Sequence, residues 1–225
     1  MGIQVQGNGG TISEVGGNTF RALHVHFKPL EYAALGHYRM NARFALIAAQ
    51  AANSRLFVLR NNAANLIIPT RLTIKWMSLT AHTALIEDSL DCYKLTGFTV
   101  LDTTGTVTPT ASVKRTTGMA VAPGGAQVRH VTAAGAAAGM TGGTSTKDGG
   151  SFSQFPLFLA QAAMAVGDTL SRQFTALDCL DDVNGTHPFA LAQNEGFLIE
   201  NRVLLGAAAG SVVFVDLSWA EVLAF

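Results

Sequence analysis

The chain has 225 residues, of which 48% are hydrophobic and 13% are charged, and its 15 basic residues balance its 15 acidic residues. A neutral chain without a run of lysine and arginine is not typical of nucleic-acid binding, so we expect no nucleic-acid partner. Its alanine-rich apolar stretches are shorter than the ~20 residues that a membrane span needs, so we also expect no membrane partner.

The N-terminal half begins with a loop-like segment and continues with strand patterns. Residues 1–19 are rich in Gly, Asn and Thr, which predicts an extended arm. Alternating or β-branched apolar residues then predict strands, at residues 21–27, 55–60, 66–79 and 85–98. Residues 38–47 fit either element, because their alanines favour a helix while Gly36 and Tyr38 favour a sheet. The periodicity leaves this segment open.

The C-terminal half contains a long segment of unusual composition. Residues 102–150 are rich in Thr, Ala and Gly with few large apolar residues, which predicts a long loop that is functional or ordered by a partner. Further strands are predicted at residues 151–159 and 169–174. In the last forty residues, two β-rich runs flank the small residues 206–210, which predicts a C-terminal hairpin. One face of its second run is expected to carry Val213, Val215, Leu217 and Trp219.

These elements predict an all-β protein. Short strands separated by Gly-, Asn- and Thr-rich turns, with no internal repeat, indicate an antiparallel β-sandwich, and we expect the jelly-roll type. The expected organisation is the arm at residues 1–19, followed by a single sandwich domain over residues 20–225 that carries the loop at residues 102–150.

Two histidines are the candidate metal ligands. His24 and His26 are two residues apart, so a strand places both imidazoles on one face, where they can bind zinc or copper. Surface or interface histidines are the alternative reading. Because no third ligand is identified, we assign neither a metal nor a cofactor.

The sequence predicts no catalytic residues, and therefore no enzyme. It has no Gly-x-Ser-x-Gly motif, and Cys92 and Cys179 have apolar neighbours typical of core residues. Only two cysteines are present, which argues against a disulfide framework and suggests synthesis in a reducing cytoplasm. Glu87, Asp88 and Asp91 offer a carboxylate pair of the kind used in glycoside hydrolysis, but any chain with fifteen acids offers such pairs.

Several segments together resemble a family of structural proteins of tailed-bacteriophage virions. The segments that carry the resemblance are Gly7-Asn-Gly-Gly-Thr-Ile12, Gly36-His-Tyr38, Leu56-Phe-Val-Leu-Arg60, Lys114-Arg-Thr116, His187-Pro-Phe-Ala-Leu-Ala-Gln-Asn-Glu-Gly196 and Trp219-Ala-Glu221. The C-terminal block is the most specific of them, whereas residues 118–165 contribute little. The resemblance implies a structural protein of the particle without catalytic residues.

Composition favours the same reading, because a soluble monomer normally carries more surface charge than this chain does. We therefore expect a capsid decoration or cement protein in the virion, a homotrimer that stabilises the particle through many contacts with the major capsid protein or other virion proteins. The arm and the long loop are the expected contact elements, through Ile3, Val5, Ile12, Val121, Val128 and Val131. The alternative is a tail, baseplate or receptor-binding component that binds carbohydrate, since jelly rolls commonly serve as lectins.

Overall fold

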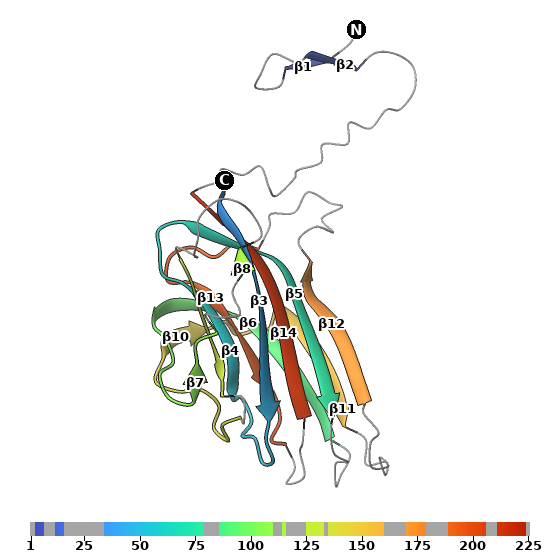
Figure 1. Ribbon diagram of the computed structural model, residues 1–225, viewed down its shortest axis with the longest axis vertical. Helices are drawn as coiled ribbons and strands as arrows, with labels where there is room; N and C mark the ends of the chain where they lie inside the picture. The colour runs from blue at the N-terminus through green and yellow to red at the C-terminus, as the bar shows by residue number, and fades with distance from the viewer. Residues whose placement is uncertain are drawn as a thin grey trace. The chain divides into compact units, whose positions relative to one another are not determined.

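The computed structural model describes residues 3–6, 12–15, 34–78, 86–109, 114–115, 125–132, 135–159, 170–178, 189–205 and 211–223. Every regular element in these ranges is a β-strand, as predicted (Figure 1). None of these residues belongs to a helix with the length and apolar character that crossing a membrane requires. The chain divides into two units, Met1–Glu31 and Tyr32–Phe225.

The first unit contains a small antiparallel ribbon. β1 (Ile3–Gln6) pairs with β2 (Ile12–Val15), and Ile3 lies opposite Val15. The segment predicted as an extended arm therefore contains two paired strands. The strand predicted at residues 21–27 lies outside the described residues.

The second unit consists of two antiparallel sheets. The order of the five-stranded sheet is β12 (Leu170–Asp178), β5 (Leu66–Ser78), β14 (Ser211–Val222), β3 (Ala34–Leu46) and β8 (Lys114–Arg115). The order of the seven-stranded sheet is β10 (Thr144–Lys147), β6 (Ile86–Val100), β13 (Gly196–Asn201), β4 (Arg55–Asn61), β9 (Ala126–Val131) and β7 (Thr106–Val107), and β11 (Ser153–Leu159) also pairs with β6. The two sheets pack face to face, which confirms the predicted antiparallel β-sandwich.

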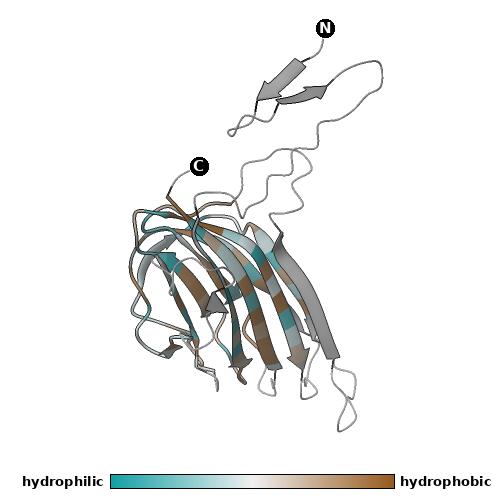
Figure 2. Ribbon diagram, turned by 45° about the horizontal axis from the view of Figure 1, so that its top comes forward, coloured by the Kyte–Doolittle hydropathy of each residue, from teal (hydrophilic) through white to brown (hydrophobic). Residues whose placement is uncertain are grey.

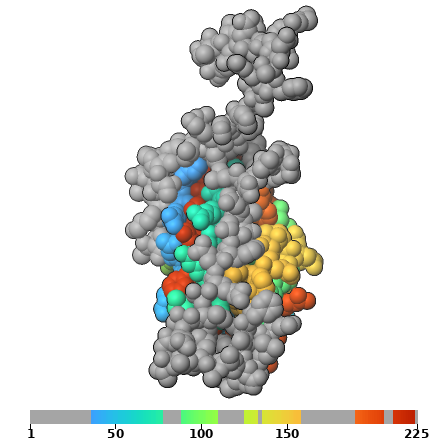
Figure 3. All heavy atoms as spheres, turned by 90° about the vertical axis from the view of Figure 1, so that its right-hand side faces the viewer, coloured from blue at the N-terminus to red at the C-terminus, as the bar shows by residue number. Residues whose placement is uncertain are grey.

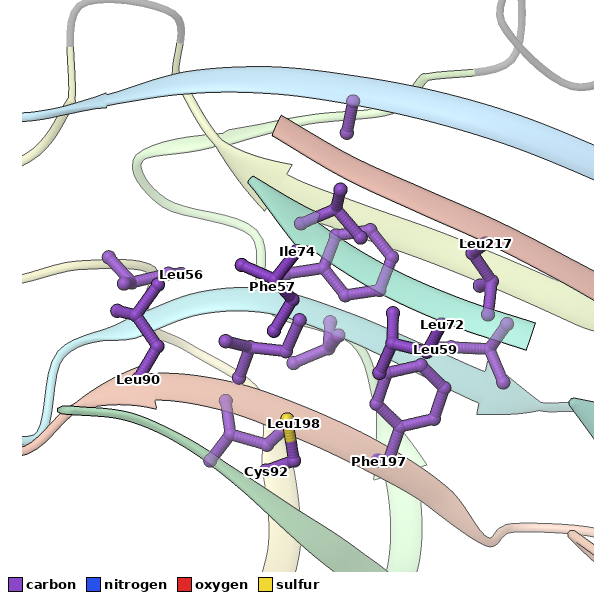
Figure 4. Close-up of a cluster of buried hydrophobic side chains, with 14 of the residues drawn as sticks. Leu56, Phe57, Leu59, Leu72, Ile74, Leu90, Cys92, Phe197, Leu198 and Leu217 are labelled. Carbon is purple, nitrogen blue, oxygen red and sulfur yellow. The ribbon is translucent and has the colours of Figure 1, made fainter. Parts of the chain in front are cut away.

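The hydrophobic core lies between the two sheets. Figure 4 shows side chains of β4, β5, β6, β13 and β14 converging in this space, with Phe57 and Phe197 stacked at a centroid separation of 5.9 Å. Cys92 is fully buried among them, as the sequence predicted, and burial raises the pKa of its thiol to about 12. Both tryptophans, Trp76 and Trp219, are also buried in this core.

The ambiguous segment at residues 38–47 is a strand, because β3 pairs with β14 along nearly its whole length. Its inward side chains are buried, namely Tyr38, Met40, Ala42, Phe44 and Leu46, whereas Arg39, Asn41 and Arg43 between them are exposed. Alternation of this kind appears in Figure 2 as bands of opposite hydropathy along the strands of the sheet. Pairing and burial thus outweigh the helix propensity of the alanines.

A register shift in β5 accounts for its irregular hydrophobic pattern. Ser218 of β14 lies opposite Arg71, but the next residue, Trp219, lies opposite Pro69, so β5 has one extra residue here. A bulge of this kind reverses the faces of the residues beyond it. Ile67 accordingly points into the main core, whereas Ile68 joins a second, small cluster with Ala220 and Val222.

The predicted C-terminal hairpin is wrong. β13 pairs with β4 and β6 in the seven-stranded sheet, whereas β14 pairs with β3 and β5 in the other sheet. Both edges of each strand are therefore occupied, and the chain between Asn201 and Ser211 passes from one sheet to the other. The predicted faces of β14 are confirmed, because Val213, Val215, Leu217 and Trp219 are all buried.

The segment predicted as a long loop contains strands that belong to the sandwich. β7, β9 and β10 all lie within residues 102–150, and β9 is paired between β4 and β7. Glycine is needed where this segment passes over β4. Gly139 has a φ of 69°, and a Cβ at this position would lie 2.7 Å from the backbone nitrogen of Arg55.

Candidate functional site

The buried carboxylates of the sandwich hold its loops and edge strands in place through hydrogen bonds and ion pairs. Glu221 near the end of β14 is the clearest case, because it is fully buried and shares the inner face with Ile67, its cross-strand neighbour on β5. Its carboxylate accepts hydrogen bonds from the backbone N–H groups of Gly125 and Ala126, both at 3.0 Å, and from Asn65 Nδ2 at 3.1 Å. Glu221 thus joins β14 to the start of β9 and to the turn before β5.

Asp88 on β6 fastens the connection that follows β13. Its Oδ1 accepts hydrogen bonds from the backbone N–H groups of Ser89, Arg202 and Val203, at 2.8, 3.1 and 2.9 Å. Burial raises the pKa of this carboxyl, and the three N–H groups oppose the effect in part. Asp88 and Asp91 are three residues apart on β6, so their side chains point to opposite faces of the sheet.

Asp91 instead has a neighbour that the sequence did not suggest. Glu200 of β13 lies directly opposite Asp91, and both carboxylates are buried. Asp91 accepts hydrogen bonds from Ser89 Oγ at 2.5 Å and from Tyr93 OH at 3.3 Å, while Lys147 Nζ lies 2.5 Å from Glu200 Oε1. Both carboxylates therefore have partners, and the Lys147–Glu200 ion pair links the edge strand β10 to β13 across β6.

A fifth carboxylate anchors the turn that precedes β10. Asp102 is buried, and its Oδ2 lies 3.1 Å from Arg55 Nη2 on β4. Arg55 also donates to Ser145 Oγ of β10 at 3.1 Å, and Gly143 N donates to Asp102 Oδ1 at 3.3 Å. Among the described residues, no group of three or more His, Cys, Asp or Glu side chains forms a metal site.

His130 on β9 bridges the two sheets. Its ring stacks on Phe44 of β3 at a centroid separation of 6.0 Å, and its Nδ1 lies 2.6 Å from the carbonyl oxygen of Val131. The residue is 7% exposed. Burial lowers the pKa of this imidazole below its ordinary value, although the hydrogen bond to Val131 opposes the shift.

Acidification is therefore expected to destabilise the protein through His130. The folded-state pKa is lowered, so the stability contributed by neutral His130 is complete above the ordinary pKa of about 6.5 and is lost as the pH falls below it. His130→Asn keeps a donor near the Nδ1 position but does not titrate. Urea unfolding should show a smaller loss of stability between about pH 7.5 and pH 5.5 in this variant than in the parent. Equal losses would contradict the assignment.

The outer face of the five-stranded sheet carries a cluster of cations, which we call the basic face. It consists of Arg39 and Arg43 of β3 and Arg71 and Lys75 of β5, all exposed, around Phe214, Asp216 and Ser218 of β14, which are partly exposed. Figure 3 shows atoms of β3, β14 and β5 (blue, red and teal) side by side at the molecular surface. Arg39 pairs with Asp216, with 2.9 Å between Nε and Oδ1.

The residues predicted as contact or metal sites are partly outside the described residues, and the rest belong to the two separate units. His24, His26 and Val121 lie outside the described residues. Ile3 and Val5 lie on β1 and Ile12 on β2, within the small ribbon of the first unit. Val128 and Val131 are buried in the main core, because β9 is built into the seven-stranded sheet, so their side chains pack inside the chain.

Sequence reasoning missed the basic face. The two cations on each strand are four residues apart, which places both of them on the same face of the sheet. That spacing was a usable signal, but nothing in the sequence indicated that β14 would align the two strands with each other. The neutral total charge of the chain also concealed the basic face. Among the described residues, five acids are buried but no lysine or arginine is, so the surface is more positive than the total charge suggests.

No family model, no curated protein and no solved structure matches this chain. Its fold and site define it as an antiparallel β-sandwich with internally fastened loops and one basic sheet face.

Proposed function

We propose that the chain is a non-enzymatic structural protein of a tailed-bacteriophage virion, which binds the outside of the capsid as a homotrimer and stabilises it as a decoration or cement protein. The sequence resemblance supports the class of protein. The low share of charged residues supports a subunit that buries part of its surface on assembly.

The strand order is the observation that carries the proposal. Eight strands of the two sheets are arranged in the orders β3-β14-β5-β12 and β4-β13-β6-β11. The last strands of the chain are thus inserted between its first strands, β14 between β3 and β5 and β13 between β4 and β6. We interpret this interleaving as two Greek keys of a jelly roll, an architecture that recurs in viral capsid proteins.

The buried carboxylates support a mechanical role. Asp88, Asp102, Glu200 and Glu221 each hold a different loop or edge strand to the sandwich, instead of converging on a single cavity. Hydrogen bonds and ion pairs of this kind make a rigid subunit. A rigid subunit can form several weak contacts at once without a large loss of conformational entropy.

Light scattering after size exclusion is the first test of the proposal. A homotrimer has a mass of about 71 kDa, which is three times 23.6 kDa. A stable trimer is expected, whereas a monomer at high protein concentration would contradict the proposed assembly.

The second test compares particles with and without the protein. Particles that lack it should assemble but release their DNA at a lower temperature, and unchanged heat stability would contradict the cement role. Specific binding to a bacterial polysaccharide array would instead assign the protein to receptor recognition.

A further inference from the structure

The basic face has a regular geometry that the strand register defines. Ser218 lies between Arg39 and Arg71 in one row across the sheet, and Phe214 lies between Arg43 and Lys75 in a second row. Strands are spaced by about 4.8 Å and rise about 3.4 Å per residue, so the four Cα atoms mark a rectangle of roughly 10 by 13 Å. Four cations thus surround a central strip that belongs to β14.

Most of this positive charge is not neutralised by the chain itself. Asp216 pairs with Arg39, while Arg43, Arg71 and Lys75 take part in none of the ion pairs among the described residues. Arg71 donates only to the hydroxyl of Thr73, at 3.2 Å. The register also places Lys114 of β8 opposite Arg39 and Asp178 of β12 opposite Arg71, so five cations and two carboxylates leave a net charge of three on the face, although the chain as a whole is neutral.

The centre of the face has the features of a protein-binding anchor. Phe214 is partly exposed and is flanked by two cations in its own row. Aromatic and arginine side chains near the centre of an interface carry a large share of its binding energy. The surrounding Asn41 and Ser218 side chains are small and polar, which suits a flat contact with another folded surface.

The arrangement fits an acidic protein surface better than a nucleic acid or a second copy of the same face. A continuous phosphate chain that crosses the rectangle would have to pass the Asp216 carboxylate, whereas separate carboxylates on a folded partner can avoid it. Two copies meeting through this face would bring like charges together, which is costly.

We propose that the basic face docks onto an acidic protein face, in which Asp or Glu carboxylates pair with Arg43, Arg71 and Lys75 around Phe214. This proposal rests on the proposed function and specifies its contact, so the partner face belongs to a neighbouring capsid subunit. Recognition is electrostatic at its rim, and binding therefore weakens as salt is added.

The test uses fluorescein-labelled poly-L-glutamate as the probe and fluorescence anisotropy as the measurement. The full chain should bind this probe at low ionic strength and release it as salt is added. The double variant Arg43→Glu/Lys75→Glu should bind about tenfold more weakly or worse. The control variant Arg129→Glu/Arg202→Glu makes the same change in charge on the other sheet and its connections, and its affinity should change by less than about twofold.

Each other outcome overturns the proposal. Equal losses in the two double variants would mean that net charge alone governs binding. Tighter binding of oligothymidylate than of poly-L-glutamate would identify the face as a nucleic-acid site. If the double reversal does not fold, as judged by circular dichroism, the neutralising variant Arg43→Gln/Lys75→Gln replaces it, and undiminished binding would then contradict the proposal.

Particle experiments separate this inference from the proposed function. Suppose that the Arg43→Glu/Lys75→Glu variant, added to particles that lack the protein, raises their heat stability as much as the parent chain does. Docking through the basic face would then be wrong while the cement role stands. If the parent chain itself does not stabilise those particles, the proposed function fails, whatever the probe binds.

Discussion

Phe197→Ala is expected to lower the free energy of unfolding by about 3–5 kcal/mol, because the ring lies at the centre of the core. Phe197 is fully buried, stacks on Phe57 with 5.9 Å between ring centroids and lies nearly perpendicular to Phe152 with 6.3 Å between centroids. These partners lie on β4 and before β11, on both sides of β13, so the neighbouring strands restrict collapse into the cavity. Urea unfolding followed by tryptophan fluorescence measures the loss, since both tryptophans are buried in the native state.

Phe214→Ala is the matched control, because it removes the same side chain from the outer face of the other sheet. Phe214 is only partly buried, so its loss should cost less than about 2 kcal/mol. Equal destabilisation of the two variants would contradict the central position of Phe197 in the core.

Glu221→Gln is expected to lower the free energy of unfolding by about 2–4 kcal/mol, although it preserves the size of the side chain. The carboxylate accepts from Gly125 N, Ala126 N and Asn65 Nδ2 with its two oxygens. An amide has one oxygen, and its nitrogen places donor against donor. At least one buried N–H group then lacks an acceptor, in a region closed to water. Equilibrium unfolding in urea measures the change.

Asp148→Asn is the control for this substitution, since it makes the same chemical change at an exposed position. It should alter stability by no more than about 0.5 kcal/mol. Protection of the amides of Gly125 and Ala126 from hydrogen exchange should fall in the Glu221 variant and remain unchanged in the control. Retained protection of both amides would show that Glu221 does not hold the start of β9.

The strands were predictable where side chains alternate along the chain. The runs that contain Val213, Val215 and Leu217 on β14 and Leu72 and Ile74 on β5 were identified from the sequence, and all of these side chains are buried. Such patterns are local, because successive residues of a strand point to opposite faces whichever strand lies beside it. Prediction was poorer for β9, where few large residues mark a strand that its neighbours β4 and β7 hold in place.

Pairing of the strands was not predictable from these patterns. The C-terminal runs looked like a hairpin because they are adjacent in sequence, yet β13 and β14 belong to different sheets. Insertion of each strand between two earlier ones satisfies both of its edges, which a two-stranded hairpin cannot do. These hydrogen-bonding partners lie more than 100 residues away in the sequence, so no short stretch of the sequence can indicate the pairing.

The all-β class, the inward faces of the main strands and the core position of Cys92 could be predicted from the sequence, since each follows from side-chain polarity and strand periodicity. Which acids are buried and which cations gather on the basic face is evident only from how the strands pair in the folded protein. Both depend on register: β14 aligns Arg43 with Lys75, and β13 places Glu200 opposite Asp91 of β6. Register is a property of several distant strands at once, and the order of residues in one strand does not specify it.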